Sequence, residues 1–138
     1  MKIWHTTSAE HSAALKIVGT FNREEDAQAA EALLKEMIQT ATEAAVEVQR
    51  LEDLEFGAKP IAGVLPSERA RKQKWREAQG LYKLDGFVER DFYDLSGPET
   101  TVEPSVGNRL EIGTDEWTFQ GLIAVLLARG ATIEIERY

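Results

Sequence analysis

The C-terminal segment, residues 109–138, constrains the possible fold more than any other part of the chain. Residues 109–112 alternate polar and apolar side chains, which is typical of a strand with one buried face. Residues 116–129 carry apolar side chains at helical spacing, and a glycine that can end a helix follows directly. Residues 131–137 then alternate again with period two. The segment therefore predicts a strand, a helix and a second strand.

The earlier part of the chain predicts further strands and one long helix. Residues 14–21 alternate like a strand, and the helix predicted over residues 22–48 begins at a good N-cap and has an alanine-rich apolar stripe. Residues 81–95 are rich in aromatic and branched side chains, which predicts a long strand with a bulge near residues 85–86. Residues 100–106 are predicted to be a shorter extended segment.

Together these elements predict an α+β fold of the ferredoxin-like type, a βαββαβ antiparallel sheet with two helices on one face. Residues 2–5 are predicted to be an extra N-terminal strand, and residues 49–80 a helical insert with its helix at about 67–79. The alternative is another α+β sandwich in which the strand at residues 2–5 sits centrally. The length of 138 residues fits a single domain over residues 1–138.

The two faces of the predicted sheet differ in chemistry. Period-two alternation places four apolar side chains beneath the helices: Leu110, Ile112, Ile133 and Ile135. The uncovered face is expected to carry a mostly polar set of mixed charge: Lys16, Val18, Thr20, Arg109, Glu111, Thr132, Glu134 and Glu136. This face is either solvated or a partner or dimer surface, and its charged candidates for contact are Arg109, Glu111, Glu134 and Glu136.

Charge and composition restrict the classes of function. The chain has 24 acidic and 16 basic residues and a net charge of −8, which repels nucleic acid and favours a basic protein partner. It has no cysteine, which excludes disulfides and thiolate metal sites, and no apolar run long enough to span a membrane. We therefore expect a cytoplasmic protein. The glycines follow no phosphate-binding motif, and no cofactor is expected.

The two histidines of the sequence, His5 and His11, lie close to Glu10 along the chain. An imidazole titrates near neutral pH, so these three side chains can act as general acid and base where the fold brings them together. The alternative is structural: His5 ends a strand, and Glu10 helps to form a turn. The spacing specifies no third metal ligand, so no metal site is predicted.

The predicted helix in the insert holds the basic cluster of the sequence. Arg69, Lys72 and Arg76 are spaced so that they share one helix face, and Trp75 lies among them. Such a face can bind phosphates or stack on bases, or it can contact an acidic protein surface, including the long helix of a second copy. The alternative, which the negative net charge favours, is a solvated helix with Trp75 packed on the core.

The start of the chain also resembles a known group of proteins. It reads Met1-Lys-Ile-Trp-His5, then Ser8-x-Glu10-His11-Ser12, then Leu15-x-x-x-Gly19-x-Phe21. This pattern is similar to that of a family of small uncharacterised bacterial proteins, and the ending, Leu126-Leu-x-x-Gly130-Ala131, is similar as well. The resemblance implies no activity, and it directs attention to the N-terminal segment.

The sequence favours a binding module over an enzyme, because the chain is small and acidic and contains no recognisable catalytic motif. We expect an inhibitor, an immunity-type protein or an accessory subunit that acts through protein–protein contacts, with a homodimer also open. The competing hypothesis is a small hydrolytic enzyme that uses His5, Glu10 and His11. A third hypothesis, nucleic-acid binding through residues 69–76, is disfavoured by the net charge.

Overall fold

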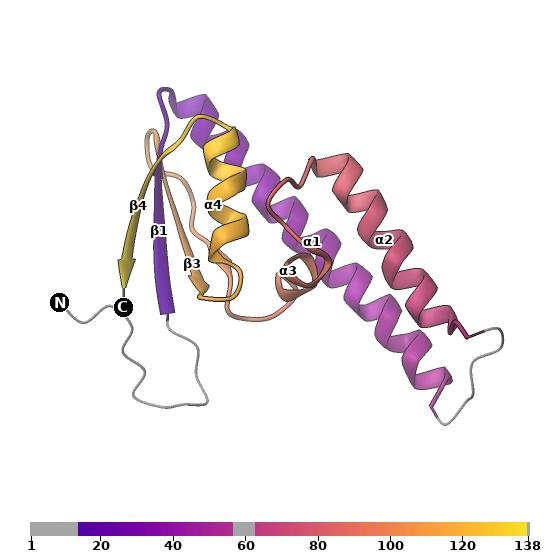
Figure 1. The fold of residues 1–138 in the computed structure, drawn as a ribbon. Helices are drawn as coiled ribbons and strands as arrows, with labels where there is room; N and C mark the ends of the chain where they lie inside the picture. Colours follow the sequence, from indigo (N-terminus) through magenta and orange to yellow (C-terminus); the bar gives the residue numbers. More distant parts are fainter. Residues whose placement is uncertain (1–13, 57–62, 138) are drawn as a thin grey trace.

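The structure, a computed structural model, describes residues 14–56 and 63–137 of the chain (Figure 1). These ranges contain a mixed α+β fold, so the predicted class is confirmed. The strands are β1 (Ala14–Thr20), β2 (Thr101–Val102), β3 (Arg109–Asp115) and β4 (Thr132–Arg137). The helices are α1 (Glu24–Leu54), α2 (Pro66–Tyr82), α3 (Glu89–Asp94) and α4 (Phe119–Ala128). The strand expected at residues 2–5 lies outside the described residues.

The four strands form one antiparallel sheet in the order β2-β3-β1-β4. β1 pairs with β3 on one side, where Ile17 is opposite Ile112, and with β4 on the other, where Ile17 is opposite Ile135. Because β3 and β4 both run antiparallel to β1, they run in the same direction, and α4 connects them. Both edges of β1 are occupied, so the described sheet leaves no central place for a further strand.

Helices α1 and α4 cover the same face of this sheet, while α2 and α3 pack against α1 farther from the strands (Figure 1). Leu110 and Ile112 are fully buried beneath the helices, as predicted, and Ile133 is partly buried. Ile135, on the edge strand β4, is 47% exposed, so the expectation that all four side chains are covered is wrong at this position. The helices cover only part of the edge strand.

Helix α1 follows the predicted alanine-rich stripe but runs farther than predicted. Its buried residues are Ala27, Ala30, Leu34, Met37, Ala41, Ala44 and Val48. It ends at Leu54 rather than near residue 48, so the predicted insert begins inside the helix. Helix α2 then packs antiparallel against the C-terminal half of α1 (Figure 1), and the backbone N–H of Ser67 donates to Glu55 Oε2 at 2.8 Å.

The long strand predicted over residues 81–95 is wrong. Helix α2 continues into this segment and ends at Tyr82, and the left-handed backbone of the next residue, Lys83 (φ 52°), caps the helix. A turn with Gly86 at φ 94° leads to α3, where the carboxylate of Asp91 accepts the backbone N–H of Val88 at 3.1 Å. The apolar side chains that suggested a strand are buried in the helical layer instead: Tyr82, Leu84, Phe87, Phe92 and Leu95.

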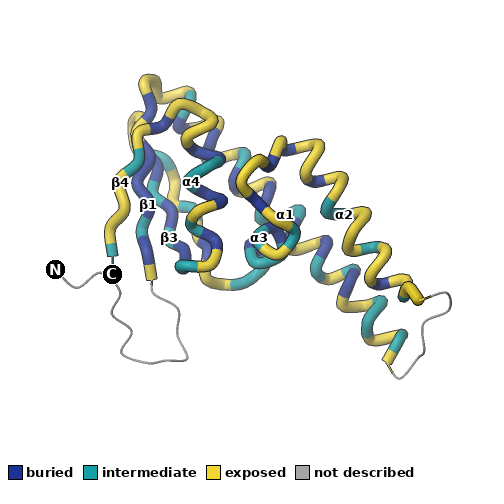
Figure 2. The backbone as a smooth tube through the Cα atoms, in the orientation of Figure 1, coloured by how far each residue is buried: buried dark blue, intermediate teal, exposed yellow. Residues whose placement is uncertain are grey.

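This difference changes the topology as well. Three helices precede β2, and within the described residues β2 has only two residues, so the full βαββαβ pattern with two helices is not matched. The hydrophobic core nevertheless continues from the sheet into the helical layer, because one buried cluster joins Ile17 of β1 to Leu34 of α1 and Phe92 of α3. Figure 2 shows this core as buried segments along β1 and β3 and on parts of the helices.

Candidate functional site

The predicted catalytic residues lie outside the part of the chain that the structure describes. His5, Glu10 and His11 all precede Ala14, the first described residue. The hydrolytic hypothesis requires these three side chains to converge in one cleft, and that requirement is not tested by the described residues. It stays a prediction from the sequence.

The predicted basic face lies on α2 and is exposed. Arg69, Lys72 and Arg76 are all exposed, and Lys72 lies 3.9 Å from a glutamate one turn earlier. Trp75 packs on the core, with its ring 5.8 Å from that of Phe92. The face therefore offers cations, but its tryptophan is already packed against another aromatic ring.

The sheet face opposite the helices carries ion pairs between its own strands, and Val18, which was expected to be uncovered on this face, is only 2% exposed. Lys16 of β1 lies 3.2 Å from Glu111 of β3 and 3.1 Å from Glu136 of β4. Its hydrogen bonds to Glu136 and Glu111 raise the pKa of Lys16, and the hydrogen bond from Lys16 lowers the pKa of Glu111. Arg109 lies 3.4 Å from Glu111, whereas Glu134 has no ion pair with a described residue. The charges of this face are thus largely compensated within the sheet.

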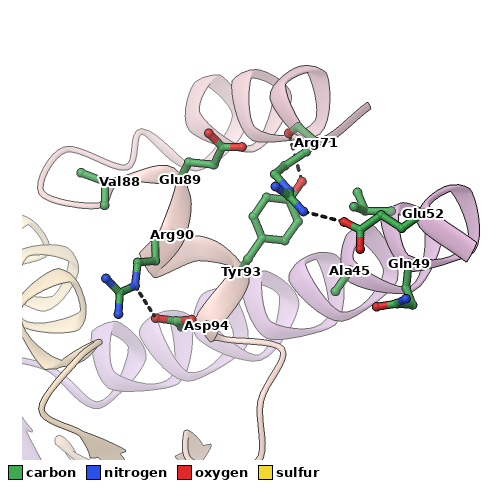
Figure 3. A pocket seen from close by; sticks show the side chains of 10 residues that line it. Ala45, Gln49, Glu52, Arg71, Val88, Glu89, Arg90, Tyr93 and Asp94 are labelled. Carbon is green, nitrogen blue, oxygen red and sulfur yellow. Dashed lines mark hydrogen bonds and ion pairs between the residues drawn. The ribbon is translucent and has the colours of Figure 1, made fainter. Parts of the chain in front are cut away.

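A groove that the sequence did not predict runs between α1, α2 and α3 (Figure 3). Its cavity has a volume of about 610 Å³. Helices α1 and α2 contribute Ala45, Val48, Gln49, Glu52 and Arg71. Helix α3 and the residue before it contribute Val88, Glu89, Arg90, Tyr93 and Asp94. Figure 3 shows Arg71 and Arg90 on opposite sides of Tyr93.

A second hollow continues this groove past α3. It has a volume of about 410 Å³ and shares Arg90, Tyr93 and Asp94 with the first. The loop after α3, the end of β3 and the start of the next turn supply its other walls: Ser96, Gly97, Glu99, Asp115 and Trp117. We name the two hollows together the acidic groove, because five carboxylates and two guanidinium groups line them: Glu52, Glu89, Asp94, Glu99, Asp115, Arg71 and Arg90.

Within the described residues, two of these five carboxylates have an ion-pair partner. Arg71 lies 2.6 Å from Glu52, which is a close contact between two helices. Arg90 lies 4.0 Å from Asp94, and its side chain is 71% exposed. An exposed pair contributes little to stability, about 0–1 kcal/mol. Because five carboxylates and two guanidinium groups line the acidic groove, it keeps an excess of negative charge.

Carboxylates gather around Asp94. Burial raises the pKa of Asp94, and the positive charge of Arg90 opposes this rise. Repulsion from the carboxylates of Asp115, Asp91 and Glu99 raises the pKa further. Because like charges disfavour the ionised form, an added cation among these groups would relieve the repulsion.

Aromatic and apolar side chains complete the acidic groove. Burial raises the pKa of Tyr93 to about 12, and its hydroxyl donates to the backbone carbonyl of Arg71 at 3.0 Å (Figure 3). Trp117 is 57% exposed, and the guanidinium of Arg90 lies 5.1 Å from the centre of its ring. Val88 is also exposed at the rim. The groove thus combines accessible apolar surface with negative charge.

Close packing of the loop before α3 on α4 sets the position of the groove. A Cβ atom on Gly121 of α4 would lie 2.7 Å from the ring of Phe87, so only glycine fits there without a shift. A Cβ atom on Gly86, whose φ is 94°, would likewise lie 2.7 Å from the Cβ of Ala124 in α4. Just before α4, Asp115 Oδ1 accepts two backbone N–H groups at 3.0 Å each, which fixes its carboxylate at the end of β3.

Within the described residues, these features define an α+β protein with a four-stranded antiparallel sheet, a helical layer on one face and an acidic groove that runs between α1, α2 and α3 to the end of β3. The chain belongs to the family of unknown function DUF6375, whose family profile matches residues 1–137. The expected membership of a family without a known activity is therefore confirmed. No curated protein and no solved structure gives a significant match.

Two further properties concern the described ranges alone. No helix within them is long and apolar enough to cross a membrane. They also contain no group of three or more histidine or carboxylate side chains placed to hold a metal ion.

Sequence reasoning missed the acidic groove because it assigned a strand to residues 81–95. In a strand, Arg90 and Asp94 would share a face but lie more than 10 Å apart, at about 3.3 Å per residue. In a helix the same two residues are neighbours one turn apart. The available signal was this opposite-charge pair at helical spacing, preceded by a turn residue, Gly86.

Proposed function

We propose that this protein is a small acidic binding module that engages a basic segment of a protein partner through the acidic groove. The observation that carries the proposal is the excess of carboxylates over guanidinium groups along a continuous groove that also exposes Val88 and Trp117. Negative potential attracts a basic partner and raises its association rate. The net charge of −8 acts in the same direction over the whole surface.

The mixed lining favours a peptide segment over other ligands. Nucleic acid or a small anion would meet the repulsion of the groove carboxylates. Arginine and lysine side chains have apolar stems that pack on aromatic rings while their charged ends meet carboxylates. A segment that alternates such residues with apolar ones therefore matches both properties of the groove.

We further propose that the protein is a bacterial inhibitor, an immunity-type protein or an accessory subunit, and that it acts in the cytoplasm. A homodimer is compatible with this role. We also propose a ferredoxin-like relationship for the sheet with α1 and α4, because β3, α4 and β4 form a crossover that encloses β1.

Binding of designed peptides tests the proposal. The probes are labelled peptides of about 12 residues that combine arginine with leucine, matched peptides with glutamate in place of arginine, and a short DNA duplex, all followed by fluorescence anisotropy. We expect saturable binding of the arginine peptides alone. Binding should weaken from 0.1 M to 1 M salt, where the Debye length falls from about 10 to about 3 Å. Preference for the glutamate peptides or DNA, or binding indifferent to salt, contradicts the proposal.

The hydrolytic alternative rests on His5, Glu10 and His11 alone, and no contact among the described residues favours it. Its test is hydrolysis of a panel of ester and phosphoester substrates by the wild type and by His5→Ala and His11→Ala. Turnover that both substitutions abolish would favour an enzyme and count against a pure binding module.

A further inference from the structure

Arg90 is a cation in the middle of the acidic groove, and few contacts hold it there. Its Nε lies 4.0 Å from Asp94 Oδ2, one turn along α3, and its side chain is 71% exposed. Its guanidinium also lies over the ring of Trp117, 5.1 Å from the ring centre. Arg71, in contrast, is anchored to Glu52 at 2.6 Å. An exposed pair at i,i+4 contributes only about 0.3–0.5 kcal/mol.

The hollow around Arg90 is lined by more carboxylates than Arg90 pairs with. Glu99 and Asp115 line the same hollow, yet no ion pair joins either of them to Arg90 in the described structure. Arg90 is attached to α3, beside Asp94, which limits where its guanidinium can go. A guanidinium that enters from outside has no such limit and can bond two carboxylates at once in the bidentate geometry that arginine prefers.

We propose that Arg90 is a displaceable placeholder: in the free protein it occupies the place over Trp117 that an arginine side chain of the partner takes in the complex. This inference rests on the proposed function. The stem of the partner's arginine lies on Trp117 and Tyr93, and its charge lies among Asp94, Glu99 and Asp115. Arg90 then turns toward solvent, which its exposure allows.

Removal of Arg90 should therefore strengthen binding, because the competing guanidinium is gone and Asp94 loses its ion-pair partner. We expect Arg90→Ala to bind the arginine–leucine peptide about three- to tenfold more tightly than the wild type does. The matched control is Arg23→Ala. Arg23 is similarly exposed (68%) and pairs with Asp26 at 3.2 Å, but it lies before α1, at the end remote from the groove. Its loss removes the same charge and should change the affinity less than about twofold.

Asp94→Asn completes the set, because it keeps the size of the side chain but removes its charge, and it should weaken binding severalfold. Circular dichroism of each variant checks that the fold is kept. Tighter binding by Arg90→Ala and not by Arg23→Ala supports the placeholder role.

Three other results overturn it. Unchanged or weaker binding by Arg90→Ala, while the wild type binds, removes the placeholder role and leaves the proposed function intact. Equal tightening by Arg90→Ala and Arg23→Ala attributes the effect to overall charge and also removes it. Absence of peptide binding by the wild type and by Arg90→Ala overturns both this inference and the proposed function.

Discussion

Two helical glycines should respond in opposite ways to the same substitution. Gly80 of α2 and Gly121 of α4 each lie in a terminal turn, and alanine is favoured over glycine in helices by about 0.5–1 kcal/mol. An added Cβ on Gly80 would meet no atom within 4 Å. On Gly121 it would lie 2.7, 2.8 and 3.1 Å from three ring atoms of Phe87, which is itself only 5% exposed.

Because both substitutions gain the same helical preference, the difference between them isolates the steric conflict with Phe87. Inserting a methyl group into a packed core costs about 1–3 kcal/mol. We therefore expect Gly80→Ala to raise the free energy of unfolding by about 0.5–1 kcal/mol and Gly121→Ala to fall about 1–3 kcal/mol below it.

Urea denaturation followed by circular dichroism at 222 nm measures both values. In a Phe87→Leu background, Gly121→Ala should cost less than it does in the wild type, because the smaller side chain makes room for the added methyl group. The reasoning is refuted if Gly121→Ala stabilises the protein as much as Gly80→Ala does. That result would mean that the loop before α3 does not pack on α4 as described.

Other predictions follow from single contacts. Glu31 accepts hydrogen bonds from Lys35 at 2.7 Å and from the backbone N–H of Ser105 at 2.8 Å, and these bonds lower its pKa from 4.5 to about 2. Its contribution to stability is therefore complete above pH 4.5 and is lost as the pH falls toward 2. By urea denaturation, Glu31→Gln should cost about 1–2 kcal/mol of unfolding free energy at pH 6 and less at pH 2.5. The control Glu36→Gln, on the exposed side of α1, should cost less than about 0.5 kcal/mol. Equal losses for the two variants would disprove the stabilising hydrogen bond between Glu31 and Ser105. Absorbance titration should show a tyrosine that ionises near pH 12 and is absent in Tyr93→Phe, and its persistence in that variant would refute the assignment. Phe92→Ala should cost about 3–5 kcal/mol, since Phe92 is fully buried where α3 meets the core, and a loss below about 1 kcal/mol would argue against that packing.

The C-terminal elements were predictable because their signals are local. Alternation over residues 109–112 and 131–137 marks strands β3 and β4, and the register places Leu110 and Ile112 on the buried face. Gly130, at φ 86°, ends the helix between them as its position suggested. The same alternation identified the charged face, where Lys16 bridges two glutamates.

The segment over residues 81–95 was not predictable from the same kind of pattern. Its apolar side chains pack against several elements in succession, so neither period two nor period 3.6 describes them. Helix α3 has only six residues, from Glu89 to Asp94, too few for a period to appear. Burial from more than one side thus produced a run that imitates a buried strand.

Apart from the Arg90–Asp94 pair at helical spacing, the acidic groove was not predictable from the sequence, because its walls come from distant parts of the chain. Glu52, Arg71, Asp94 and Asp115 belong to four different elements, and no local spacing relates them. Its negative sign follows in part from the net charge, but its place depends on how α3 packs on α1 and α2 and how the loop before α3 packs on α4. Tertiary packing alone brings these side chains together.

Mapping a bound peptide by NMR tests the central claim most directly. An ¹⁵N-labelled sample titrated with the arginine–leucine peptide should show its largest amide shift changes between Val88 and Gly97 and at Trp117. The account is contradicted if the changes instead centre on the basic face of α2, at Arg69, Lys72 and Arg76, or on the strand face around Lys16.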